Sequence, residues 1–195
     1  PHCSPPLTTP RVPTGLHSLR YFHVSVSEPC PGVPQFFVAA GYLDGNPMGQ
    51  YDSELGRFVS RPDWVKEAVE PQFRDTLTRI KQKKQHVNLQ DLDNLRLRYN
   101  QSGTTHVIQT MYGCDLLEDN STRGYWQHAY NGRDFIAFDM DTMTFTPADD
   151  GALITKRKWE VDRSVAERWR HYLTTTCIEW LRKHVSYGRP MLERK

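Results

Sequence analysis

The sequence predicts an α+β fold, in which an eight-stranded antiparallel sheet carries two long helices across one face. Two observations favour it. Residues 17–60 and 105–146 alternate apolar and polar side chains in short runs between turn signals, whereas 62–98 and 152–187 repeat apolar residues every three or four positions. The chain therefore holds two copies of one plan, four strands followed by a long helix.

The first half opens with a proline-rich arm, residues 1–14, which contains five prolines and fits neither a helix nor a central strand. Asp44-Gly45 is the signal of a tight hairpin turn, and the cluster Pro29-Cys30-Pro31-Gly32 ends the first strand. The strands that we expect here are 17–26, 35–43, 47–52 and 57–60.

The first helix is expected over 62–98, with bends near Pro71 and at 86–88. Its apolar stripe is Val65, Val69, Phe73, Leu77 and Ile80. The basic run Lys81-Gln82-Lys83-Lys84 is interpreted as part of the charged, solvated face of this helix.

The second half repeats the pattern, with turns at 118–120 and at Asn131-Gly132 and a helix that begins after Asp149-Asp150-Gly151. Gly188-Arg189-Pro190 is expected to stop this helix. The strands predicted here are 105–115, 122–129, 134–138 and 142–146.

Each half covers its own apolar faces poorly, so we expect residues 15–103 and 104–195 to lie side by side as two halves of one platform. Two helices spaced apart above a rigid sheet leave a groove, which is a ready binding site. The fold alone thus favours a binding module.

Composition excludes several classes of function. The 195 residues are 37% hydrophobic and carry a formal net charge of only +2, with mixed signs along the chain. These values exclude general disorder and argue against a nucleic-acid partner. No apolar run approaches the ~20 residues that cross a bilayer.

The histidines have no nucleophile at an interpretable spacing, and no phosphate loop or metalloprotease motif occurs. The four cysteines show no CxxC spacing, which argues against a metal site. We therefore expect no enzyme activity, no cofactor and no metal ion.

Two glycosylation sequons, at Asn100 and Asn120, lie beside turn-forming residues. Together with an even number of cysteines they favour a secreted or cell-surface protein with disulfides.

Many ordered motifs resemble one family. They are His17-Ser18-Leu19-Arg20-Tyr21-Phe22, Gly41-Tyr42-Leu43-Asp44, Arg98-Tyr99-Asn100-Gln101-Ser102, Tyr112-Gly113-Cys114-Asp115, Arg123-Gly124-Tyr125, Tyr130-Asn131-Gly132-Arg133-Asp134-Phe135, Thr155-Lys156-Arg157-Lys158-Trp159-Glu160 and Cys177-Ile178-Glu179-Trp180-Leu181. From Gly15 onward the chain resembles the groove-forming platform (alpha-1/alpha-2) of the major histocompatibility complex (MHC) class I heavy chain, with a second half closer to non-mammalian members.

This resemblance implies a disulfide between Cys114 and Cys177 that joins the sheet to the second helix. It also implies a peptide-carboxylate site made of Arg98, Thr155 and Lys158, with Trp159 donating its indole N–H to the last peptide carbonyl.

At the amino end of the groove the family places four tyrosines and a tryptophan. Tyr21, Tyr172 and Trp180 match this set, but Phe73 and His184 stand where two of the tyrosines would be. Two hydroxyls are therefore missing, and the carboxyl end is predicted to be the better-formed anchor. Tyr112 is interpreted as a packing residue first and a ligand contact second.

Cys3 and Cys30 are predicted to form a second disulfide. The first strand spans ~30 Å, and an extended arm from Cys3 to Gly15 spans ~40 Å, so the arm reaches back along that strand beneath the sheet.

Two functions remain open at this point. The first is a platform that displays a peptide or small ligand to T-cell or natural killer (NK) cell receptors, with beta-2-microglobulin as a candidate partner. The second is a stand-alone class I-like ligand or a secreted or virus-encoded decoy, which binds an immune receptor directly. The arm, Phe73 with His184 and an end at Lys195, ahead of the family's third domain, favour the second.

Overall fold

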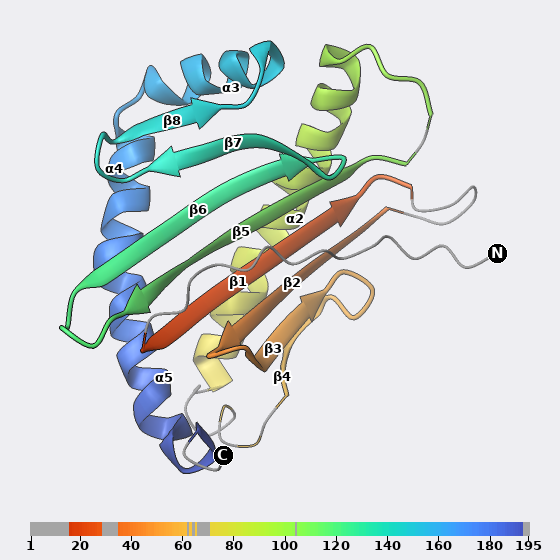
Figure 1. The fold of residues 1–195 in the computed structure, drawn as a ribbon. Coiled ribbons are helices and arrows are strands. Elements are labelled where there is room, and N and C mark those ends of the chain that lie inside the picture. Colours follow the sequence, from red (N-terminus) through yellow and green to blue (C-terminus); the bar gives the residue numbers. More distant parts are fainter. Residues whose placement is uncertain are drawn as a thin grey trace.

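The computed structural model describes residues 16–28, 35–61, 63, 65, 71–103 and 105–192. Its centre is one eight-stranded antiparallel sheet with the strand order β4-β3-β2-β1-β5-β6-β7-β8 (Figure 1). The strands are β1 (His17–Val26), β2 (Phe36–Leu43), β3 (Asn46–Asp52), β4 (Arg57–Ser60), β5 (Val107–Leu116), β6 (Thr122–Tyr130), β7 (Arg133–Asp139) and β8 (Thr144–Pro147). The predicted fold class is confirmed.

The two halves of the sheet meet where β1 pairs with β5, and Tyr21 lies directly opposite Tyr112 in this pairing. Both predicted hairpin turns are present. Asp44 and Gly45 have φ values of 49° and 79°, and Asn131 and Gly132 have values of 49° and 76°. Two consecutive positive φ angles are what a two-residue turn requires, and asparagine, aspartate and glycine adopt them at least cost.

The first helical stretch is α2 (Pro71–Arg98), which runs without interruption through residues 86–88. Helix α5 continues to Leu192, so the predicted stop at Gly188-Arg189-Pro190 is wrong. Proline has a φ angle that suits a helix, and near a helix end it removes only one backbone hydrogen bond from the last turns.

The second helical stretch is divided rather than a single helix. It consists of α3 (Asp150–Glu160), α4 (Ser164–His171), the π-helix η1 (Tyr172–Thr176) and α5 (Cys177–Leu192). The division after α3 coincides with a turn in which the Asp162 carboxylate accepts hydrogen bonds from the Ser164 N–H and hydroxyl.

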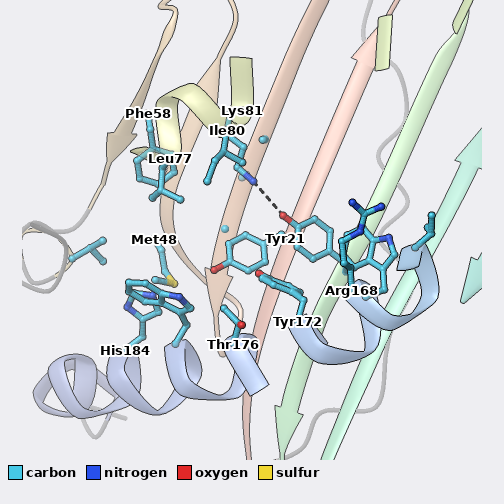
Figure 2. A pocket seen from close by; sticks show the side chains of 18 residues that line it. Tyr21, Met48, Phe58, Leu77, Ile80, Lys81, Arg168, Tyr172, Thr176 and His184 are labelled. Carbon is cyan, nitrogen blue, oxygen red and sulfur yellow. Dashed lines mark hydrogen bonds between the residues drawn. The ribbon is translucent and has the colours of Figure 1, made fainter. Parts of the chain in front are cut away.

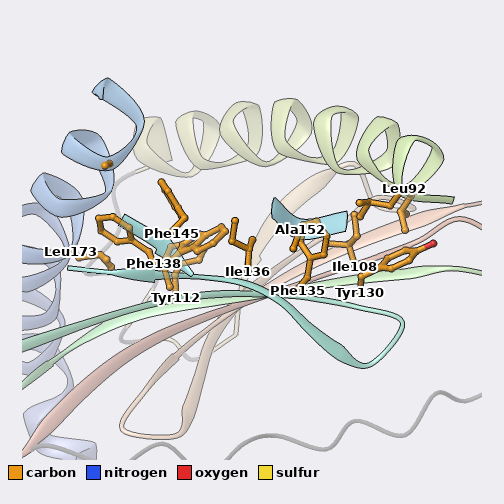
Figure 3. Close-up of a cluster of buried hydrophobic side chains, with 13 residues drawn as sticks. Leu92, Ile108, Tyr112, Tyr130, Phe135, Ile136, Phe138, Phe145, Ala152 and Leu173 are labelled. Carbon is orange, nitrogen blue, oxygen red and sulfur yellow. The ribbon is translucent and has the colours of Figure 1, made fainter. Parts of the chain in front are cut away.

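The main core lies between the sheet and the helices, with members from α2, α3, α4 and η1 (Figure 3). Among the described residues, six of its thirteen buried members are aromatic, and these come from β5, β6, β7 and β8. Its buried members are Leu92, Leu95, Ile108, Tyr112, Trp126, Tyr130, Phe135, Ile136, Phe138, Phe145, Ala152, Ala166 and Leu173.

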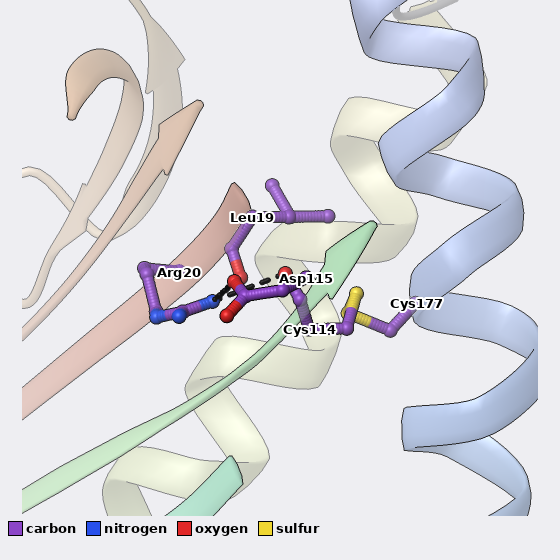
Figure 4. Close-up of a disulfide and its surroundings, with 5 residues drawn as sticks. All are labelled: Leu19, Arg20, Cys114, Asp115 and Cys177. Carbon is purple, nitrogen blue, oxygen red and sulfur yellow. Dashed lines mark hydrogen bonds and ion pairs between the residues drawn. A yellow bond between two sulfur atoms is a disulfide. The ribbon is translucent and has the colours of Figure 1, made fainter. Parts of the chain in front are cut away.

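A disulfide joins Cys114 of β5 to Cys177 at the start of α5 (Figure 4). Both cysteines are fully buried in a second apolar cluster, with Leu19, Leu43 and Leu181. The predicted pairing is confirmed. Cys3, Cys30 and the arm lie outside the described residues, so their pairing stays a prediction.

Asn100 and Asn120 are both exposed, at the end of α2 and in the turn between β5 and β6. We expect both to carry glycans when the protein passes through a eukaryotic secretory pathway, because a transferase reaches exposed turns. Glycosidase treatment should lower the mass by two glycans. Ser102→Ala and Thr122→Ala should each remove one, and a protein with neither glycan would contradict the prediction.

Candidate functional site

A cavity of about 610 Å³ lies between the two helical stretches, above the sheet (Figure 2). Its lining is mostly apolar and aromatic, as is usual in ligand-binding sites. The floor includes Tyr21, Ala39, Met48 and Tyr112, the α2 wall includes Leu77, Ile80 and Lys81, and the opposite wall includes Arg168, Trp169, Tyr172, Thr176, Trp180 and His184.

Three tyrosines meet at the centre of this cavity. The rings of Tyr21 and Tyr112 are stacked with their centroids 5.1 Å apart, and Tyr172 contacts Tyr112 edge to face at 5.8 Å. Burial raises the pKa of all three phenols above the ordinary value, so they stay neutral. The hydroxyls of Tyr21 and Tyr172 hydrogen-bond each other, and the Tyr112 hydroxyl accepts a hydrogen bond from Lys81.

Tyr172 belongs to η1, whose wider turn places it and Thr176 on the cavity wall. Such π-helical turns occur often at functional sites. No pattern in the sequence predicted this π-helical turn.

His184 lines the α5 wall of the cavity, stacked on Trp180 with the ring centroids 5.5 Å apart. It is only 3% exposed, and burial together with Lys183 lowers its pKa to about 4. The imidazole is thus neutral at pH 7 and does not repel a ligand ammonium group. The backbone of Phe73 lies in α2; its side chain is outside the described residues.

The residues expected at the carboxyl end are brought together only in part. Arg98 Nη1 donates to Thr155 Oγ1 at 2.7 Å and to the Gly151 carbonyl at 2.9 Å, which ties α2 to α3. Lys158 is exposed on α3, and Trp159 packs against Trp126 and Phe145. All four lie outside the lining of the cavity.

Beside this cluster the Tyr99 hydroxyl donates to the Asp149 carboxylate at 2.7 Å. This contact is a second tie between the same two helical stretches.

Lys81, Arg168 and Thr176 are polar residues of the cavity lining that the sequence analysis did not identify as site residues. Lys81 was assigned to a solvated face, but it is only 6% exposed and its ammonium contacts His23 and Tyr112 of the sheet.

The interpretation is wrong for Lys81, because the positions of α2 that face the cavity recur every four residues and Lys81 follows Leu77 in that series. Ile80, which the sequence places on the apolar stripe, is instead 54% exposed. That spacing was the signal available in the sequence.

The structure thus places an apolar cavity between a sheet floor and two helical walls. Residues 15–192 match the family described as class I histocompatibility antigen, domains alpha 1 and 2. The chain belongs to this family.

Three relatives illustrate the match. The chain is 47% identical over 180 residues to the chicken (Gallus gallus) class I histocompatibility antigen F10 alpha chain, covering 92% of this chain and 52% of that one. It is 45% identical over 184 residues to the mouse (Mus musculus) H-2 class I histocompatibility antigen K-W28 alpha chain, covering 92% and 49%. It is 41% identical over 181 residues to the rat (Rattus norvegicus) MHC class I-related protein 1, covering 93% and 52%.

The chain thus spans about half the length of the curated relatives that it matches. Among the helices that the structure describes, none has the length and apolar character that a membrane crossing needs.

Proposed function

We propose that this protein binds a peptide or other ligand in the cavity between α2 and the α4–η1–α5 stretch, and displays it to T-cell or NK-cell receptors. The observation that carries the proposal is the cavity itself, about 610 Å³ in volume and lined by aromatic side chains with a few polar groups. The ligand would lie between the helices, where a receptor that contacts both would read it.

The polar groups suit a peptide backbone. Tyr21, Tyr112 and Tyr172 line the cavity with neutral hydroxyls, and Arg98 with Thr155 offers a cation and a hydroxyl beyond that lining, where α2 approaches α3. Thr155 accepts from Arg98 and keeps its own hydrogen for a ligand carboxylate. We propose a binding role without enzyme activity or a cofactor.

We propose an extracellular location, reached through the secretory pathway and either secreted or at the cell surface. The buried disulfide and the two exposed sequons support it. Beta-2-microglobulin is the candidate partner beneath the sheet.

A second candidate function is a class I-like ligand or decoy that binds an immune receptor directly and presents nothing. The observation that favours it is His184, which stacks on Trp180 at the end where the family resemblance calls for a tyrosine hydroxyl. A groove whose amino end is closed in this way would hold a free peptide terminus less tightly.

Mild acid elution from the secreted protein, followed by mass spectrometry, distinguishes the two functions. Presentation predicts a set of peptides of narrow length, recovered in near-stoichiometric amount. The variant Thr176→Trp, which fills the cavity from η1, is the control and should yield few. If the unmodified protein and this variant give the same background, the groove does not present ligands.

A further inference from the structure

Lys81 leaves α2 toward the cavity and ends among neutral groups (Figure 2). Its Nζ lies 3.0 Å from His23 Nε2 and 3.2 Å from the Tyr112 hydroxyl oxygen, and 5.5 Å from the centroid of the Tyr21 ring. Burial lowers the pKa of His23 well below its ordinary value and raises those of both tyrosines, so none of the three supplies a negative charge at pH 7.

No aspartate or glutamate occurs among the described residues that line the cavity. On the opposite wall Arg168 adds a second cation, and His184 is neutral at pH 7. On α2 itself, Lys84 is a cation one turn away, but it lies outside the lining of the cavity and interacts with Asp91. The described lining is therefore electropositive, and none of its residues offers the buried ammonium of Lys81 a counter-ion.

A buried ammonium without a counter-ion is costly, and burial lowers the pKa of Lys81 to about 8. A carboxylate placed at Nζ would offset this cost and form a charge-assisted hydrogen bond. A neutral amide in the same place would leave the charge unmatched.

We propose that Lys81 selects peptides whose side chain in this part of the groove is acidic, aspartate or glutamate. This inference rests on the proposed presenting function and adds a ligand specificity to it. A peptide is favoured over a small organic acid because the groove has cationic groups at two separate places, and a peptide has both an acidic side chain and a terminal carboxylate.

The spacing of these two places gives the position of the acidic residue. Lys81 and Arg98 are 17 residues apart on the uninterrupted helix α2, which corresponds to about 25 Å at ~1.5 Å per residue. An extended peptide advances roughly 3.3–3.6 Å per residue, so about seven residues cover that distance. A nonapeptide with its carboxylate at Arg98 thus brings its second residue to Lys81.

The test compares two synthetic nonapeptides that differ only in glutamate or glutamine at position 2, by competition binding to the complete secreted protein at pH 6.5. We expect the glutamate peptide to bind at least about tenfold more tightly. In Lys81→Met this preference should fall to within about twofold, whereas the exposed Lys83→Met, two positions along the same helix, should keep it. Lys81→Gln serves as a second variant, with similar length and no charge.

A pH series adds a readout that packing alone would not give. The preference for glutamate should be constant from about pH 6 to about pH 8, where the peptide carboxylate is ionised and Lys81 is protonated in the free protein. It should decline as the pH rises through and above that value, because the free protein then loses the ammonium that the carboxylate needs. Affinity for the glutamine peptide should change little, and a glutamate preference unaffected up to pH 10 would overturn the role of Lys81.

Three other outcomes would overturn the inference. Equal affinity of both peptides would remove the specificity but leave the presenting function intact. Dodecanoic acid serves as a competing small acid. If it displaces the glutamate peptide from the unmodified protein but has no effect on Lys81→Met, the ligand that Lys81 selects is a small organic acid and not a peptide. Failure of both peptides to bind, with no peptide in the acid eluate, would remove the presenting function itself.

Discussion

An Asp115→Asn variant is expected to lose about 3–5 kcal/mol of unfolding free energy, because it leaves a buried guanidinium without its counter-ion. In the protein Asp115 is 1% exposed and lies 2.6 Å from Arg20 Nη1, the ion pair drawn in Figure 4. Arg20 also donates to the Cys114 carbonyl and lies over the ring of Tyr125, 4.7 Å from its centroid. The pair spans the β1–β5 junction, so it helps to hold the two halves of the sheet together.

Chemical denaturation at pH 7 measures this effect. The double variant Arg20→Met/Asp115→Leu is the matched control, since it removes both charges and fills the space with apolar groups. It should lose less stability than Asp115→Asn alone. A single variant within about 0.5 kcal/mol of the unmodified protein would show that the pair is not desolvated.

The second large effect is expected from Cys114→Ala/Cys177→Ala. The disulfide closes a loop of 63 residues, and on the chain-entropy estimate its removal costs about 4 kcal/mol. For a chain of this size that corresponds to a melting temperature lower by roughly 10 °C. Replacing both cysteines avoids a buried free thiol in the variant.

Thermal unfolding with and without dithiothreitol provides the control. The unmodified protein should shift on reduction by at least the amount seen in the double variant. Any additional shift when the double variant itself is reduced belongs to Cys3 and Cys30, and so tests their predicted pairing. A double variant with an unchanged melting temperature would contradict the structural role of the Cys114–Cys177 bridge.

The sequence was most informative where local chemistry determines the backbone. Asp44-Gly45 and Asn131-Gly132 form turns with positive φ angles that few other residue pairs tolerate, and they fix the register of the hairpins around them. Alternation along the strands then fixes which side chains face the core. For the same reason the strand ends were predicted to within about two residues.

The division of the second helical stretch and the burial of Lys81 depend on contacts that the sequence pattern does not show. A helical period predicts one long helix after Gly151, but a turn at Asp162 divides it and the π-helical turn at Tyr172–Thr176 widens it. The site was predicted from family motifs, which identify tyrosines but not the cation between them. Lys81 was missed because a lysine is exposed by default, and only its contacts with His23 and Tyr112 reveal that it lies inside the groove.

On the proposals above, the space between α2 and the α4–η1–α5 stretch is a ligand site with Lys81 as its charge-selective group. A crystal structure of the protein secreted from eukaryotic cells, without added ligand, would reveal the occupant. We expect continuous density of an extended chain between the helices, with a carboxylate within hydrogen-bond distance of Lys81 Nζ and a terminal carboxylate near Arg98 and Thr155. A groove closed by its own side chains, or a bound chain with no acidic group at Lys81, would contradict these proposals.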